Sequence, residues 1–353
     1  MKKIVIVALI ITLVISSVAL FAQGGAEAGA NKTYSVRMPT GESEGDFMTV
    51  WAKNFATHMA EKTDGRWNIE VFPYGTLGEN DDIVELAQNG VVEFVFADYG
   101  WLSSYVPQTN TLALHYIWPK DNVPAILEWV NKNGKFMAMM EEKYREKDLV
   151  PLGIYYEGWQ WLTSKKPINE LSDLVGLKTR IMASNMLSRD YRAYGIDPTP
   201  MSYGEIYSGL QTGLLDAQSQ PMFANYSMGF YEVADFFVQL WAEPFIGIPC
   251  VNKGFFDSLT EADQKLIRGY WKGVVAESAV WIQAQNDKLQ KEIATKRPSI
   301  SFKELNPSEV AQLKTLAETK VYPDFPSIGG PDSAKMLEVL RKDVADAQKA
   351  LGL

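Results

Sequence analysis

Apolar and polar positions in the first hundred residues alternate with two different periods. Three stretches alternate every second residue or form short apolar runs bounded by turn residues, which predicts strands. Two stretches between them carry an apolar stripe at helical spacing, and the second ends at Asn89-Gly90, a helix-terminating pair. The strands are expected at 33–38, 67–72 and 91–97, and the helices at 46–62 and 81–88. Strands alternating with helices predict a parallel α/β fold.

The middle of the chain repeats this order, and a long helical pattern follows it. Strands are expected at 149–156, 176–181, 214–218 and 236–241, with a helix at 185–194. Residues 260–296 then keep helical spacing, with a capping sequence at Thr260 to Asp263. At about 1.5 Å per residue this helix would be roughly 55 Å long, so we expect it to cross two lobes.

The N-terminus has the three parts of an export signal. Lys2 and Lys3 precede an apolar run over 4–20, and small residues precede Gln23. A membrane span is the alternative, but the run is at or below spanning length and a Gly/Ala-rich linker follows it. We therefore expect a signal peptide over 1–22, cleaved near Ala22, and a periplasmic mature protein.

Composition and charge narrow the class of protein. The chain has 353 residues, of which 46% are hydrophobic, so the exported part is long enough for two lobes. Its formal net charge is −9 and it lacks basic tracts, which argues against nucleic acid as a partner. Cys250 is the single cysteine, so no intrachain disulfide is possible.

Arg180 is the most informative candidate for ligand binding. It lies near the end of the strand expected at 176–181, where Leu177, Thr179 and Ile181 alternate with polar residues. A guanidinium held on a strand end is a rigid two-pronged donor that matches a carboxylate. A surface ion pair is the alternative interpretation of the same residue.

Five segments, taken together and in this order, resemble the substrate-binding subunits of TRAP (tripartite ATP-independent periplasmic) transporters of the dicarboxylate-binding type. They read FPYGTLGE at 72–79, QNGVVE at 88–93, GLKTR at 176–180, GLQTGLLDAQ at 209–218 and FYEVA at 230–234. The resemblance covers essentially the whole mature chain. It implies an extracytoplasmic protein that captures a small organic acid and delivers it to TRAP membrane subunits.

The resemblance also implies an architecture. It predicts a two-lobe, periplasmic-binding-protein-like fold with hinge strands, a long lobe-spanning helix and a ligand cleft between the lobes. Lobe I is expected over 33–157 with 247–285, and lobe II over 158–246. The long helix at 260–296 would span both lobes, and 297–353 would form a helical segment packed on them.

Arg180 matches the family's signature arginine, so the resemblance implies that it pairs with a ligand carboxylate. Two positions depart from the common pattern. Gln160 stands where many members have a second Arg, and Gln220 stands where many have Asn before the Pro. Without a second cation, a second carboxylate would lose its hydration unpaired, so we expect a monocarboxylate rather than a dicarboxylate or sialic acid.

Three further residues are candidates for the cleft. Tyr99 follows an expected strand at its carboxyl end, where ligands of open α/β sheets gather, and Trp159 could supply an aromatic wall. Glu42 follows the first strand in a Gly-rich turn and could accept from a ligand hydroxyl or amine. The alternatives are core packing for the aromatic residues, including Trp101, Trp161 and Trp241, and plain solvation for Glu42.

Nothing in the sequence points to an enzyme. His58 and His115 are the only histidines, and both are expected to be structural or on the surface. No zinc-binding cluster, nucleophile elbow or phosphate loop is present, and we expect neither a metal nor a cofactor. A carboxylate pair for glycoside hydrolysis is not excluded by composition. A sensor-feeding binding subunit and a secreted hydrolase are therefore the alternatives to a transporter subunit.

Overall fold

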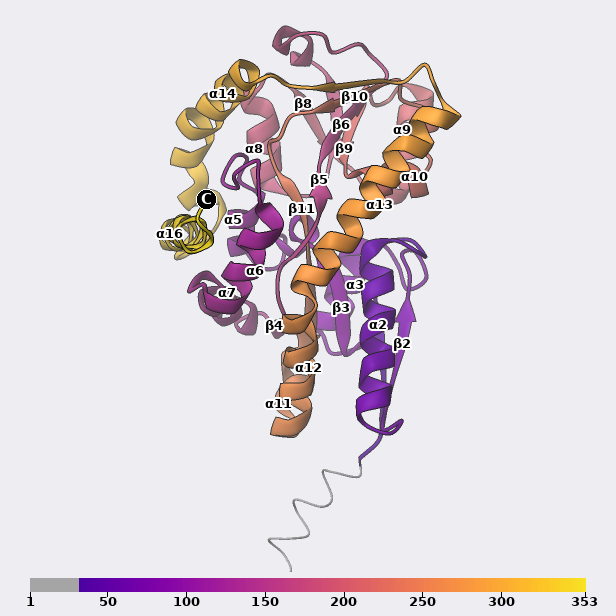
Figure 1. Ribbon diagram of the computed structural model, residues 1–353, viewed down its shortest axis with the longest axis vertical. Helices are drawn as coiled ribbons and strands as arrows, with labels where there is room; N and C mark the ends of the chain where they lie inside the picture. Colours follow the sequence, from indigo (N-terminus) through magenta and orange to yellow (C-terminus); the bar gives the residue numbers. More distant parts are fainter. Residues whose placement is uncertain (1–31) are drawn as a thin grey trace, which may run out of the picture.

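The computed structural model describes residues 32–353, so the predicted signal peptide lies outside the described residues. The chain forms two α/β lobes, one around β3, β11 and β4 and the other around a six-stranded sheet (Figure 1). No helix within 32–353 is both long enough and apolar enough to cross a membrane.

Lobe I contains the N-terminal strands and helices. Its strands are β1 (Tyr34–Pro39), β2 (Trp67–Phe72), β3 (Phe94–Asp98), β4 (Leu149–Pro151), β5 (Tyr155–Trp159) and β11 (Pro244–Asn252). β1 and β2 pair in parallel, and a bridge between Thr40 and Phe96 joins β1 to β3. Its helices are α2 (Phe47–Lys62), α3 (Asn80–Gln88), α4 (Tyr99–Leu102), α5 (Asn110–Ala113), α6 (Val123–Asn133), α7 (Phe136–Arg145) and α11 (Lys253–Asp257).

Lobe II is built on the sheet order β12-β10-β6-β9-β7-β8. The strands are β6 (Trp161–Ser164), β7 (Lys178–Ile181), β8 (Asp197–Pro200), β9 (Ala217–Gln220), β10 (Phe236–Gln239) and β12 (Ser301–Glu304). The helices are α8 (Asn185–Ala193), α9 (Ile206–Thr212) and α10 (Met222–Ser227). β12 lies parallel to β10, so the segment expected to be only helical after 297 also supplies an edge strand to this lobe.

The α/β fold is present, but its sheets are mixed rather than parallel throughout. β7 pairs in parallel with β8 and β9, but β6 runs antiparallel to β9 and β10. In lobe I, β11 runs antiparallel to β3, β4 and β5. The chain enters lobe II through β6 and returns to lobe I through β11. Each of these strands runs antiparallel to the neighbours with which it pairs.

The two crossings lie side by side. Trp159 at the end of β5 pairs with Pro244 at the start of β11, and β6 begins two residues after β5 ends. Gly158 has a φ of +113°, and a Cβ there would lie 2.3 Å from Asn286 Nδ2. Only glycine combines this backbone conformation with this approach, so the β5 crossing can pack directly against α13.

The stretch expected as one long helix forms two helices. α12 (Glu261–Gly273) begins with Thr260 Oγ1 accepting from the backbone N–H of Asp263, and α13 (Val275–Lys296) follows after Val274. Glycine and β-branched valine are weak helix formers, which accounts for the interruption at this point. α13 contacts β5 and α6 of lobe I and α10 of lobe II, and Figure 1 shows it running alongside both lobes.

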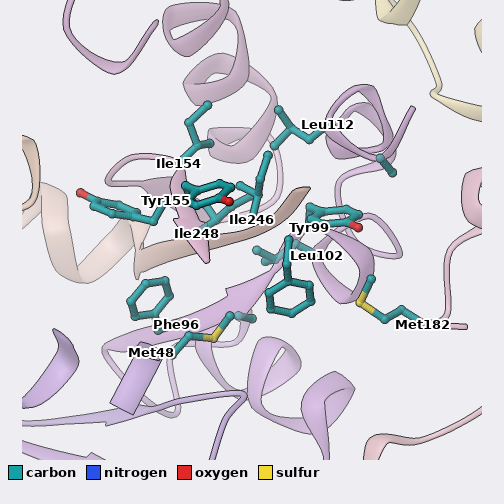
Figure 2. Close-up of a cluster of buried hydrophobic side chains, with 14 of the residues drawn as sticks. Met48, Phe96, Tyr99, Leu102, Leu112, Ile154, Tyr155, Met182, Ile246 and Ile248 are labelled. Atoms are coloured by element: carbon teal, nitrogen blue, oxygen red, sulfur yellow. The ribbon is translucent and has the colours of Figure 1, made fainter. Parts of the chain in front are cut away.

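Buried side chains from both crossings form a continuous core. Figure 2 shows Phe96 of β3, Ile246 and Ile248 of β11, and Tyr155 of β5 packed together. The C-terminal helices are α14 (Pro307–Leu316), α15 (Phe325–Ile328) and α16 (Ser333–Leu351). α16 packs on α6 and α7, which ties the end of the chain to lobe I.

Candidate functional site

A small pocket lies where the two lobes meet. Its lining comes from Gly41, Glu42, Asn80, Asp98 and Trp101 of lobe I, from Tyr203, Gln220, Phe223 and Ala224 of lobe II, and from Phe245 on β11. The free volume between these side chains is only about 10 Å³. The lobes are therefore closed on one another, and a ligand can enter only when they separate.

Arg180 lies beside this pocket with unused hydrogen-bonding capacity. It sits on β7 between Thr199 of β8 and Gln218 of β9, and it is 0% exposed. Its Nε donates to the backbone carbonyl of Met201 at 2.9 Å, but Nη1 and Nη2 have no partner among residues 32–353. A buried guanidinium with two free nitrogens is prepared for one bidentate anion.

The electrostatic neighbours of Arg180 place it at the pocket wall. Burial lowers the pKa of Arg180 to about 10, and the charges of Asp98 and Tyr203, which line the pocket, act in the opposite direction. The side chain therefore stays cationic at neutral pH. Its charge is desolvated and Asp98 offsets it only in part, because Asp98 Oδ1 already accepts from the backbone N–H groups of Gly100 and Trp101.

Buried carboxyl groups stand on the lobe I side of the pocket. Glu42 is 3% exposed, so it is not the solvated side chain that the alternative interpretation predicted. Its Oε2 accepts from the backbone N–H of Met48 at 2.7 Å, while Oε1 has no donor in the described chain other than a protonated Glu157. Both carboxylate oxygens of fully buried Glu157 are also without a donor there.

Glu42 and Glu157 share a proton. Burial raises the pKa of Glu42 to about 7, and a hydrogen bond with Glu157 partly offsets that rise. Burial, followed by the charge of Glu42, raises the pKa of Glu157 well above its usual range. Glu157 is therefore the protonated partner, and because neutral pH lies close to the pKa of Glu42, the pair carries at most one negative charge there. Asp46 lies behind Glu42, and burial raises its pKa to about 8.

Tyr99 and Gln160 contact each other behind the pocket lining. Tyr99 Oη donates to Glu243, and Gln160 Nε2 donates to Tyr99 Oη at 3.4 Å. His115 Nε2 lies 3.2 Å from Glu243 Oε1, close enough for an ion pair although not aligned as a hydrogen bond. Burial lowers the pKa of His115, but the carboxyl groups of Asp190 and Glu243 outweigh it and the net shift is upward.

Trp159 lies in a different place from the other candidates. Successive side chains of an extended segment point to opposite sides, and Gln160 points to Tyr99. Trp159 instead stacks edge-to-face on Trp241, with ring centroids 5.4 Å apart, in a separate pocket against α13. The structure thus brings Glu42, Gln220 and Arg180 together, places Tyr99 and Gln160 behind them, and leaves Trp159 outside.

Several pocket residues were not identified from the sequence. Asp98 follows a buried strand immediately before Tyr99, and that position at a strand end was a usable signal. Tyr203, Phe223 and Phe245 gave none, because they come from short helices and a hinge strand whose neighbours only the fold decides.

Within the described residues, no three His, Cys, Asp or Glu side chains are grouped so that they could hold a metal ion. An interlobe pocket with buried carboxyl groups on its lobe I side and the partly unpaired guanidinium of Arg180 beside it suits the capture of a small ligand. The chain belongs to the bacterial extracellular solute-binding proteins, family 7, whose sequence pattern it matches over residues 40–325.

The relatives are binding subunits. The chain is 30% identical over 304 residues to the ectoine/5-hydroxyectoine-binding periplasmic protein UehA of Ruegeria pomeroyi, covering 86% of this chain and 88% of that protein. It is 29% identical over 307 residues to the ectoine-binding periplasmic protein TeaA of Halomonas elongata, covering 87% and 89%. Both are named as solute-binding periplasmic proteins, so the enzyme and sensor alternatives gain no support from these comparisons.

Solved structures agree with this assignment. The periplasmic ectoine-binding protein of the TeaABC TRAP transporter of Halomonas elongata superposes with a TM-score of 0.84 at 28% identity, covering 89% of this chain and all of that one. The same relative in its apo state gives a TM-score of 0.77.

Proposed function

We propose that this chain is the solute-binding subunit of a TRAP transporter and captures a small zwitterionic monocarboxylate between its lobes. Arg180 receives the carboxylate, and Glu42 faces the cationic group of the ligand. The observation that carries the proposal is the buried guanidinium of Arg180, whose Nη1 and Nη2 have no partner among the described residues, beside a pocket that Glu42 lines on the lobe I side.

The charges of the pocket favour a zwitterion over a simple anion. Arg180 supplies one buried positive charge, and the pair of Glu42 and Glu157 supplies at most one buried negative charge, which a cationic group of the ligand would favour by lowering the pKa of Glu42. A ligand that carries both charges compensates both groups. A ligand with a carboxylate alone leaves the acidic pair uncompensated, and a dicarboxylate places its second charge near that pair, which is unfavourable in a desolvated site.

The apolar part of the lining suits a compact ring. Trp101, Phe223 and Phe245 line the pocket and can bury a ring face at a small cost in side-chain entropy. Ectoine combines these features, since it is a cyclic amidinium that carries one carboxylate, and two relatives are named for binding it. We therefore propose ectoine, or a solute of the same charge pattern, as the ligand.

Calorimetry with purified protein tests the proposal. Ectoine is expected to bind more tightly than pyruvate, which has the carboxylate alone, and both more tightly than succinate. Glu42→Gln keeps the size of the side chain but removes its charge, so it should weaken ectoine binding and leave pyruvate binding nearly unchanged. Equal losses for both ligands would contradict the assigned role of Glu42, and tight succinate binding would contradict the monocarboxylate proposal.

A further inference from the structure

A second pocket lies on the hinge side of the molecule. It is enclosed by α13, by β5 and β6 at their junction, and by the end of β10, elements that lie together in Figure 1. Its free volume is about 160 Å³, against about 10 Å³ for the interlobe pocket. Nothing in the proposed capture of a solute between the lobes uses this second pocket.

Three indole side chains form its apolar walls: Trp159, Trp161 and Trp241. Trp159 and Trp241 meet at 78° between their ring planes, so they form two sides of a corner. Trp241 has a φ of +53°, a conformation that bulky residues rarely adopt, and its backbone N–H donates to Gln239 Oε1 at 2.9 Å. The fold therefore holds this indole in place at a local conformational cost.

The polar groups of this pocket are mainly amides, and several are unused. Trp241 Nε1 is buried without a partner among the described residues, and Gln239, whose Oε1 accepts from the Trp241 backbone N–H, has its Nε2 left to donate. Tyr156 Oη of β5 donates to Oε1 of Gln283 on α13 at 3.2 Å, and Gln283 Nε2 donates to Asp287 Oδ1 of the same helix at 2.9 Å. Gln290 adds another amide.

A cationic side chain already occupies the rim. Lys120 Nζ lies 4.1 Å from the centre of the Trp241 ring and 3.8 Å from Glu304 Oε2. It takes the cation position over that indole and compensates the charge of Glu304. Because Lys120 already takes the cation position over Trp241, and Asp287 and Glu304 on the lining disfavour an anion, the pocket suits an uncharged ligand.

We propose that this hinge-side pocket binds a small uncharged polyhydroxy compound of about monosaccharide size. The C–H faces of such a molecule pack on the indoles, and its hydroxyl groups both donate and accept, as side-chain amides do. Gln239 Nε2 and Trp241 Nε1 supply donors, and Asp287 supplies an acceptor. The site is separate from the interlobe pocket, because the side chains of Trp159 and Gln160 leave the chain on opposite sides.

Saturation-transfer difference NMR with D-glucose as the probe tests this site on the full mature protein. D-glucose should give a saturable signal, with choline as the cationic comparison giving a weaker one. Trp161→Ala should raise the dissociation constant about fivefold, the scale of one lost aromatic contact. Gln290→Leu removes an amide while keeping its bulk, and should also weaken binding if Trp161→Ala proves unstable.

Two variants serve as controls. Trp129→Ala removes a half-buried indole of α6 outside the pocket, and Arg180→Ala disables only the interlobe site, so both should bind D-glucose normally. The proposal is overturned if no saturable signal appears up to about 100 mM D-glucose, if choline binds more tightly, or if Gln290→Leu leaves the signal unchanged. Loss of the signal in Arg180→Ala would assign it to the interlobe pocket instead. Ectoine binding is measured separately, so failure of one site does not imply failure of the other.

Discussion

Replacing Arg180 should separate ligand affinity from fold stability. The guanidinium is fully buried and its two terminal nitrogens have no partner in the described chain, so in the closed, ligand-free conformation its charge is a cost. Its pKa falls from 12.5 to about 10, and a shift of this size corresponds to about 3 kcal/mol. Arg180→Met keeps most of the volume and removes that cost.

Arg180→Met also breaks one hydrogen bond. The bond from Nε to the Met201 carbonyl is worth about 1 kcal/mol, and its loss leaves a buried acceptor unpaired. The relief of desolvation is the larger effect, so the free energy of unfolding of ligand-free protein should rise by about 1–2 kcal/mol. Affinity for ectoine should fall by more than about 2 kcal/mol, or about 30-fold, because the ligand carboxylate loses its partner.

Urea unfolding without ligand and calorimetry with ectoine measure the two effects. Arg180→Lys is the matched control: it keeps the charge but loses the two-pronged geometry, so it should bind poorly without gaining stability. Near-normal affinity in Arg180→Met would refute the assigned role. A variant that is clearly less stable than wild type would refute the conclusion that the guanidinium is uncompensated in the closed pocket.

Three other outcomes are expected. In a thermal-shift screen, ectoine should raise the melting temperature more than succinate, malate or fumarate, and a largest shift from any of these diacids would contradict the pocket charges. The stability of ligand-free protein should fall as the pH rises from about 4 to about 8, because the folded pKa values of Glu42 (about 7) and Asp46 (about 8) lie above the unfolded ones. Glu157→Gln should flatten this pH profile of the free energy of unfolding, measured with urea. An unchanged profile would contradict the shared proton. Small-angle scattering should show a smaller radius of gyration with ectoine than without it. Ser227→Ala removes the 2.7 Å hydrogen bond to Asp46 across the lobes and should shift the ligand-free protein further toward the open form. An identical radius with and without ligand would argue against lobe closure.

The elements with strong local periodicity were predictable from the sequence. The strand over 67–72 is present as expected, and α2, α3 and α8 lie within a residue or two of their expected bounds. These elements depend on side-chain spacing within one segment, which a sequence displays directly. The position of Arg180 on a short strand was also readable, because the alternation around it is local.

Tertiary structure decided which candidates share a pocket. The raised pKa of Glu42 depends on burial that brings it against Glu157 of a distant strand. The separation of Trp159 from Gln160 depends on what packs against each side of the crossing. The direction of β6 and β11 and the docking of β12 on β10 depend on strand pairing between remote segments. Periodicity predicts whether a side chain faces the core or the solvent. The burial and pairing that make a charged side chain a binding group arise only when distant segments pack together.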